Sequence, residues 1–541
     1  MRHTLFQLLA EKTPIRPEAT APDAQLDDPN ELDKDNRLLL DDLQNNILSG
    51  HHKDTAHYIF LNFHDGEVEQ AKYLLGMLAR SSVERTMVLR ALGEPDSLEE
   101  LRTGPLKQRL QARKGTGPFL IDADDYNEIR DMRLVSEREM RRARERGLEP
   151  DAQEFVLSLM LSHSGYEKLQ EDAPDDPAFR EGMWERRAKL NDTWPDGAEK
   201  RYGVDAVLII AFDSTPDREA RAKVFERVVS RLADVDHTDV GRVLRNRIKR
   251  EHDDRTSAIE PFGFVDGVSQ PRFYRDARNT PTVPLDTVLV PDPNGRTRYA
   301  SGTYFAFRKL KQNVQRFYDQ AGEIAVATKR SVDQVLAELV GRQRNGDPLV
   351  PGGSGVDEFD YSTDPKGLKC PFHAHVRRVN PRSDVGDSER RSLVRRGMPY
   401  GPCLVREADG RPALSADNQV QWEGEGEGKG NGGGAPGEVG LLFLCAQADI
   451  GRQFEHIQAT WANNVQFPWG KMTGADVLTG SLPAGQTNRI RSIHRNPADD
   501  STYTVGLDTA WEPVVEFQGG EYFFAPSIGF LRGLLDDLLK Q

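Results

Sequence analysis

The sequence predicts an α+β protein with at least two domains, on the basis of three observations. The chain has 541 residues, which is too many for one compact hydrophobic core. Strand-like and helix-like segments are mixed along it without the strict strand–helix–strand alternation of a parallel sheet. No glycine-rich phosphate loop follows a predicted strand, which argues against a doubly wound nucleotide-binding fold.

Composition and charge exclude several classes of protein. The chain is 37% hydrophobic and 29% charged, and its formal net charge of −14 argues against a general nucleic-acid binder, which needs a basic face. No apolar run approaches the roughly 18 residues that span a membrane, and residues 1–10 lack a good secretory signal. The cysteines Cys370, Cys403 and Cys445 have neither zinc-site nor disulfide spacing. We therefore expect a cytoplasmic protein that binds neither nucleic acid nor membrane.

Two strand–helix pairs stand out in a predicted N-terminal domain over residues 37–280, which follows a flexible arm over residues 1–36. Residues 58–63 are rich in β-formers, and a helix is predicted after them from apolar side chains at helical spacing. The apolar run at residues 206–212 predicts a buried strand, and Thr215-Pro216 then supplies a helix cap and a first-turn proline. The helix after the first of these strands spans 68–79, and the other elements expected here are a charged helix over 130–153 and a polar insertion over 165–200.

The predicted C-terminal domain, residues 281–541, repeats this mixture of elements. Residues 423–438 consist largely of glycine and glutamate, so we expect a flexible loop inserted within the domain. Patterning predicts strands over 299–307 and 441–445, and helices over 308–321, 331–342 and 450–461.

One acidic residue, Asp266, stands inside the apolar, glycine-rich segment 262–271, Phe-Gly-Phe-Val-Asp-Gly-Val-Ser-Gln-Pro. A carboxylate in such surroundings is partly buried and needs partners, or it becomes neutral. It is therefore a candidate acid/base. Most Asp-Gly pairs only close a turn, and the segment by itself favours that use.

His373 and His375 are candidate metal ligands. If their segment is extended, both side chains lie on one face, and His-x-His on a strand is one way to build a metal site. No further ligand is evident nearby, and a histidine on an apolar element is more often a core residue.

Two other segments combine features of a site with features of ordinary packing. Arg395 stands beside an apolar tract, where a buried arginine needs an anionic partner. For Arg396 a surface position is favoured. Leu441 and Phe443 share one face of a predicted strand. Such a face usually packs in a core, and less often it lines a cofactor pocket.

Six segments follow one another along the chain: 42–50, 263–267, 371–382 with its Asn-Pro-Arg end, 395–401, 440–443 and 519–527. In this order they resemble the dye-decolourising peroxidase family of haem enzymes over nearly the whole ordered chain. The Gly-x-x-Asp-Gly pattern at 263–267 is the family's signature but is weak alone, and the specificity comes from the order of all six. The chain is longer than many members and is similar to the larger-chain subgroups.

The resemblance implies two ferredoxin-like domains with antiparallel sheets, and haem b bound in the C-terminal domain. His375, rather than His373, falls at the position of the proximal iron ligand. Asp266 falls at the position of the distal acid/base and Arg395 at that of the distal arginine.

The same resemblance assigns roles around the haem. Leu441 and Phe443 match the apolar residues that line the distal pocket, and Arg377 is implied as a partner for a haem propionate. A proximal histidine usually bonds an acceptor through its second ring nitrogen. For that acceptor we consider Asp449 and Glu455.

The implied reaction is the oxidation of dyes, phenols and other electron donors by hydrogen peroxide. Asp266 would take a proton from peroxide and return it, while Arg395 would stabilise the developing charge. A free aspartate, with a pKa of about 3.9, still acts as a base where a free histidine is protonated, so we expect an acidic optimum. Bulky dyes would pass electrons through surface aromatics, with Trp461, Tyr400 and Tyr522 as candidates, although ordinary packing is their commoner use.

Three other functions stay open at this point. The first is a haem-binding or haem-handling protein without peroxidase turnover, although such a carrier needs neither Asp266 nor Arg395. The second is a non-haem metalloenzyme that uses His373 and His375. The third, an interaction module, rests only on the acidic charge and the Gly-rich loop. The active form is expected to be a monomer or homodimer.

Overall fold

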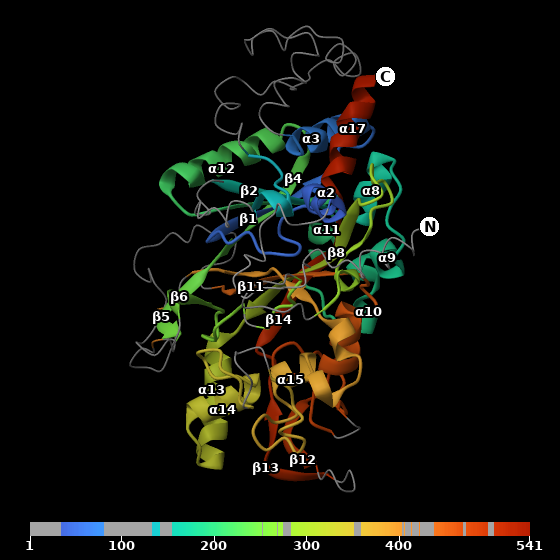
Figure 1. Ribbon diagram of the computed structural model, residues 1–541. Coiled ribbons are helices and arrows are strands. Elements are labelled where there is room, and N and C mark those ends of the chain that lie inside the picture. The colour runs from blue at the N-terminus through green and yellow to red at the C-terminus, as the bar shows by residue number, and fades with distance from the viewer. Residues whose placement is uncertain are drawn as a thin grey trace, which may run out of the picture.

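The computed structural model describes residues 34–80, 132–140, 154–250, 253–267, 269–273, 283–350, 359–402, 405, 413, 421, 438–468, 472–495 and 502–540. These residues form an elongated molecule in which two antiparallel sheets pack face to face between two helical layers (Figure 1). The strands of the sheets are β1 (Thr55–Asn62), β2 (Phe155–Leu161), β3 (Ala206–Phe212), β4 (Asp234–Arg242), β7 (Val290–Pro291), β8 (Ser301–Gln312), β9 (Val394–Arg395), β10 (Met398–Tyr400), β11 (Gly440–Gln447) and β14 (Val515–Ala525).

Each sheet has the strand order of a ferredoxin-like domain. In the N-terminal sheet the order is β4-β1-β3-β2, and in the C-terminal sheet it is β10-β11-β8-β14, so in each the first strand lies between the third and the fourth. The predicted fold class is therefore confirmed. The apolar run of β3 is buried along its whole length, as expected for a strand covered on both faces.

The two sheets are joined at both edges. β14 pairs with β2 through Phe524 and Leu161, and β10 pairs with β4 through Tyr400 and Gly241. The strands thus form a closed circuit around a shared core. Its members come from both sheets and include Tyr58, Phe60, Phe305, Phe307, Leu442 and Leu444.

Helices cover the outer face of each sheet (Figure 1). On the N-terminal sheet, Thr215 caps α12 by accepting the Arg218 N–H, as its sequence predicts. The helices of the N-terminal half are α2 (Lys34–Asp42), α3 (Val68–Leu78), α8 (His163–Leu169), α9 (Pro177–Glu185), α10 (Arg187–Leu190), α11 (Ala198–Tyr202) and α12 (Pro216–Val229), of which α9 and α11 pack against β14. Those of the C-terminal half are η3 (Leu285–Thr287), α13 (Val314–Thr328), α14 (Val332–Val340), α15 (His375–Val379), η4 (Arg382–Asp384), η5 (Ser388–Arg391), α16 (Phe454–His456) and the π-helix η6 (Ile457–Ala462).

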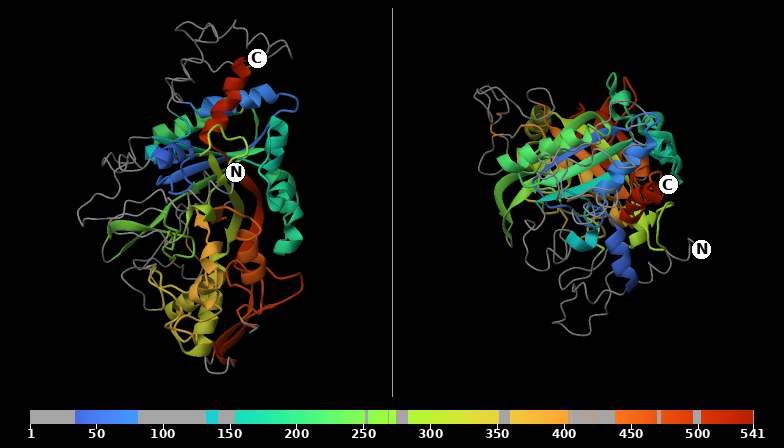
Figure 2. Two further views of the ribbon diagram at one scale, coloured as in Figure 1. Left: turned by 45° about the vertical axis from the view of Figure 1, so that its right-hand side comes forward. Right: turned by 90° about the horizontal axis from the view of Figure 1, so that it is seen from above.

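The last helix, α17 (Ile528–Lys540), returns to the N-terminal layer and packs against α3 (Figure 2). Asp42 fixes its start, because its Oδ1 accepts the N–H of Gly529 at 2.5 Å. Residues from the predicted C-terminal domain, 281–541, thus pack within the predicted N-terminal domain. Two hairpins complete the fold: β5 (Leu244–Arg250) with β6 (Asp253–Ile259), and β12 (Asn488–Arg495) with β13 (Thr502–Trp511).

Several local predictions need correction. The helix expected over 308–321 begins only at Val314, because residues 308–312 continue β8 and pair with β11 and β14 on either side. The supposed insertion 165–200 is largely helical, and the apolar strand β2 was not predicted. The segment with the two histidines is not extended, since α15 begins at His375. Most of the arm 1–36, most of the charged segment 130–153 and nearly all of the loop 423–438 lie outside the described residues.

Candidate active site

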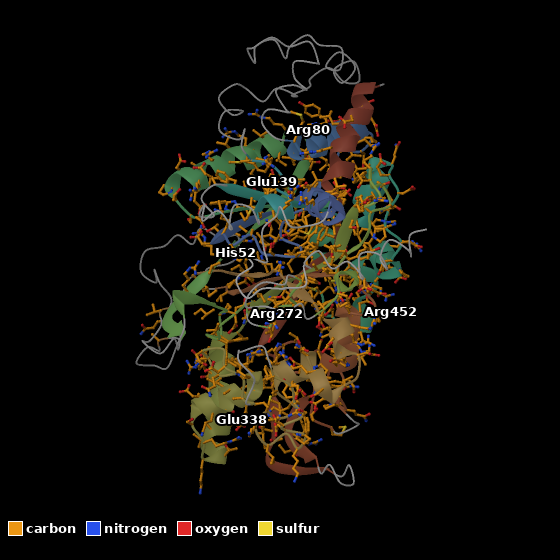
Figure 3. All side chains as sticks on the ribbon, viewed as in Figure 1. His52, Arg80, Glu139, Arg272, Glu338 and Arg452 are labelled. Carbon is orange, nitrogen blue, oxygen red and sulfur yellow. The ribbon has the colours of Figure 1, made fainter. Side chains whose placement is uncertain are left out.

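A cavity of about 890 Å³ opens beside the outer face of β11 in the C-terminal half. Five residues predicted from the sequence line it: Asp266, His375, Arg395, Leu441 and Phe443. Its volume lies within the roughly 300–1,000 Å³ that is usual for small-molecule and cofactor sites. Figure 3 labels Arg272, another lining residue, near the middle of the long axis of the molecule.

Strand alternation supplies the apolar wall of the cavity. Leu441 and Phe443 face it and are half-buried, whereas Leu442 and Leu444 point into the core between the sheets and are fully buried. Leu310 on β8 is the register partner of Leu441 and also lines the cavity. Both chosen residues of β11 therefore border the cavity.

A rigid turn presents the half-buried side chain of Asp266. Gly263 and Gly267 have φ of 96° and 78°, a left-handed backbone that glycine adopts without steric cost. The N–H of Asp266 donates to the carbonyl of Ala258 at 2.9 Å, and its Oδ1 accepts the N–H of Gly267 at 2.6 Å. The Gly-x-x-Asp-Gly pattern thus has a local structural cause, and it presents a half-buried carboxylate at the cavity.

A second carboxylate, Glu260, holds this turn from inside. It accepts the N–H groups of Phe262 at 2.9 Å and Phe264 at 3.0 Å, and the side-chain amide of Gln312 at 2.9 Å. Burial raises the pKa of Glu260, and the nearby charge of Asp266 adds to this, while the three hydrogen bonds lower it. Glu260 therefore ties the Asp266 turn to the end of β8.

Gln270 connects the turn to the strand that carries Arg395. Its Oε1 accepts the N–H of Arg395 at 3.1 Å, and its Nε2 donates to the carbonyl of Arg395 at 3.2 Å. Arg396 is not at a free surface as expected, because its guanidinium donates to the carbonyls of Asn46 at 3.1 Å and Ile47 at 2.9 Å. The strand with Arg395 is consequently fixed from two sides.

On another side of the cavity, a buried carboxylate orients the imidazole of His375. Nδ1 lies 3.0 and 3.1 Å from the two oxygens of Asp476, which is fully buried, while the His375 side chain remains 20% exposed. Burial would raise the pKa of Asp476, but His375, the N–H of Thr479 and the charge of Arg378 lower it to about 2. An ionised Asp476 only accepts, so Nδ1 carries the proton and Nε2 is left as a ligand.

The two acids considered as acceptors for His375 are engaged elsewhere, and this prediction was wrong. Glu455 is fully buried against Arg186 at 2.5 Å and Lys189 at 2.6 Å. Asp449 accepts the N–H of Arg452 at the start of a turn. The actual partner, Asp476, could not be predicted from local sequence, because it lies 101 residues after His375 and no local pattern connects the two.

Arg377 does not line the cavity, which speaks against a propionate role. Its guanidinium is 1% exposed and bonds Asp384 at 2.6 Å and Asp364 at 3.1 Å on the other side of α15. His373 is likewise buried away from the cavity, and burial lowers its pKa to about 3. The two histidines therefore do not share a site.

Two other arginines border the cavity where Arg377 does not. Arg342 and Arg382 line the cavity, and both donate to the hydroxyl of Ser269, Arg382 at 3.0 Å. Their guanidinium carbons lie 5.3 and 4.1 Å from the ring centre of Phe359. Two stacked cations at one wall suit a ligand that carries carboxylates. Arg382 belongs to the Asn-Pro-Arg end of segment 371–382.

The three aromatics expected at the surface are all buried. Trp461 is 3% exposed and lines the cavity from the π-helix, with its ring stacked on Phe467 at 5.6 Å. Tyr400 lies under Lys309, whose Nζ is 5.0 Å from the ring centre. Tyr522 donates its hydroxyl to Glu455 at 3.2 Å. Of the three, Trp461 alone borders the cavity.

Two features are absent from the part of the chain that the structure describes. No cluster of three or more His, Cys, Asp or Glu side chains there could hold a metal ion. Among the helices described, none has the length and apolar character to cross a membrane.

Comparison with known proteins places the chain among peroxidases. Residues 257–466 match the family model described as Dyp-type peroxidase, C-terminal. The multifunctional dye peroxidase DyP2 of Amycolatopsis sp. is 31% identical over 533 residues, which is 92% of this chain and 96% of that protein. Peroxidase 2 of Mycetinis scorodonius is 29% identical over 70% of this chain and 76% of its own.

Solved structures agree with the sequence comparison. The DyP-type peroxidase of Anabaena sp. superposes with a TM-score of 0.68 at 27% identity, covering 97% of this chain and 99% of that one. The structure of Amycolatopsis DyP2 gives the same TM-score at 28% identity over 93% of this chain and 98% of that one.

Proposed function

Because this chain belongs to the dye-decolourising peroxidase family, whose members are haem enzymes, we propose that it binds haem b and uses hydrogen peroxide to oxidise dyes, phenols and other one-electron donors. The observation that carries the proposal is that one cavity holds His375, Asp266 and Arg395, which come from three separate segments. A haem carrier without turnover has no need for the second and third of these.

The residues of the cavity fit a haem. His375 offers Nε2 to iron while Asp476 fixes the other ring nitrogen, which is the usual arrangement for a ligating histidine. Leu441 and Phe443 provide an apolar wall for a porphyrin face. Arg342 and Arg382, rather than Arg377, would meet the propionates. When bound, the haem supplies the redox chemistry with peroxide.

The side chains on the peroxide side would manage protons and charge. Asp266, held by the turn at Gly263 and Gly267, would accept a proton from peroxide and return it to the leaving oxygen. Arg395 would stabilise the negative charge that develops on the leaving oxygen. The apolar side chains of β11 would exclude water and so preserve the strength of these interactions.

The test is haem binding in two matched histidine variants of the full chain. We expect the Soret band to be lost or strongly shifted in His375→Ala and kept in His373→Ala, because only His375 borders the cavity. Thermal unfolding of both variants would serve as the control that each remains folded. A protein that stays colourless and inactive after haem addition would refute the proposed function.

A further inference from the structure

Arg378 is a buried cation next to the His375–Asp476 pair, and it has no carboxylate within ion-pair distance among the described residues. Arg378 is 1% exposed. The guanidinium donates to the hydroxyl of Thr473 at 2.6 Å, the carbonyl of Phe467 at 2.9 Å and the carbonyl of Asn464, and its Nε has no partner in the structure. Burial lowers the pKa of Arg378 to about 10, so the side chain stays charged at neutral pH.

Burying a charge without a counter-ion destabilises the fold, so the buried position of Arg378 calls for a compensating interaction. The adjacent Arg377 illustrates the ordinary solution, with Asp364 and Asp384 both in direct contact. For Arg378 the stabilising charge is Asp476, which acts on it without an ion pair.

Helix α15 and the segment 473–476 explain how the three groups come together. His375 and Arg378 are three residues apart on one helix, so their side chains leave from the same face. Both reach the same segment, since His375 bonds Asp476 and Arg378 bonds Thr473. Asp476 therefore bonds His375 directly and also lies within reach of the charge of Arg378.

We propose that Arg378 is a positioning residue of the proximal site: its fixed charge limits how strongly Asp476 draws on the His375 N–H and thereby sets the reduction potential of an iron bound by His375. The inference rests on the proposed function. A carboxylate that pulls harder on the N–H makes the imidazole a stronger electron donor, which favours the more oxidised iron. Arg378 opposes this pull and holds the potential higher.

The experiment uses the full chain loaded with haem. Arg378→Gln and Arg378→Met remove the charge, while Arg378→Lys retains a charge and Thr473→Val removes one hydrogen bond without changing charge. The readouts are the ferric/ferrous midpoint potential, measured by spectroelectrochemistry at neutral pH, and the iron–histidine stretching frequency of the ferrous form, measured by resonance Raman spectroscopy.

We expect both neutral variants to shift the ferric/ferrous equilibrium toward ferric by on the order of tenfold, because removing a nearby unit charge inside a protein changes electrostatic energies by at least that much. Their stretching frequency should rise. Arg378→Lys and Thr473→Val should stay close to the starting protein. Arg378→Gln can still donate to the carbonyls of Phe467 and Asn464, so it decides the matter if Arg378→Met does not fold.

A double-variant cycle with Asp476→Asn separates electrostatics from packing. If Arg378 acts through Asp476, the Arg378→Gln shift should shrink strongly in the Asp476→Asn background. The inference is overturned if neutral variants with full haem content keep the original potential, or if the shift is equal in both backgrounds. A Soret band unchanged in His375→Ala would instead overturn the proposed function, so the two failures are distinguishable.

Discussion

Replacing Glu521 by Gln should remove a pH-dependent loss of stability. Glu521 lies on β14, and its Oε1 accepts the N–H groups of Met183 and Tyr522, both at 2.7 Å. Burial raises the pKa of this carboxyl from 4.5 to about 7, although the two N–H groups lower it. The folded protein therefore holds the proton more tightly than the unfolded chain does.

The sign and size of the effect follow from this shift. The stabilising contribution of protonated Glu521 is complete below pH 4.5 and is lost as the pH rises through about 7. Over that window the loss amounts to at most roughly 3 kcal/mol, and less where solvent reaches the half-buried side chain. Gln keeps the accepting oxygen and cannot ionise. Glu521→Gln should match the starting protein near pH 4.5 and exceed its stability at pH 8.

The assay is urea unfolding followed by tryptophan fluorescence at pH 4.5, 6 and 8, at equal haem content. Glu516→Gln on the same strand is the matched control, because Glu516 is an exposed carboxylate whose removal should leave the pH profile parallel to that of the starting protein. A Glu521→Gln variant that is less stable at pH 8, or that keeps the original pH dependence, would contradict the reasoning.

Three further predictions concern the cavity. Asp266→Asn should slow the reaction of the haem-loaded protein with peroxide by about 10²–10⁴-fold over the acidic range; stopped-flow absorbance measures this, and an unchanged rate would show that Asp266 is not the base. Gln270→Leu removes both hydrogen bonds to the backbone of Arg395, so peroxide reactivity should fall while haem content stays constant, and equal reactivity would mean that Arg395 needs no such support. Trp461→Phe should lower turnover of large dyes but not of small phenols in steady-state assays, and equal turnover of both would remove Trp461 as a relay.

Local patterns predicted the parts of the site that depend on short stretches of chain. The alternation along β11 was sufficient to place Leu441 and Phe443 on one face, and the cavity lies on that face. Asp266 could be singled out because its glycines and aromatics form an unusual frame within ten residues. The order of six such segments then indicated the family.

Partners that meet only after folding were not predictable in this way. Asp476 contacts His375 across 101 residues, and nothing in its own surroundings distinguishes it from other aspartates. The role predicted for Arg377 was wrong for a related reason. His375 and Arg377 are two residues apart, and on a helix such residues point in different directions, but the helical start at His375 was not expected. The hydroxyl of Ser269 accepts hydrogen bonds from both Arg342 and Arg382, and nothing in the sequence except its place in the Asp266 segment indicated this.

The closed circuit of strands has a consequence for how this protein is made. Strand β2 of the first sheet pairs with β3 on one side and meets β14 on the other, and α3 packs against α17, which ends at Lys540. While the ribosome is still producing the second half, the N-terminal layer lacks β14 and α17. It must wait as an incomplete nascent domain with an exposed edge and an apolar helix face, which is where aggregation begins. The N-terminal layer is therefore completed only once β14 and α17 have been made, and removing α17 should destabilise that layer through its contact with α3.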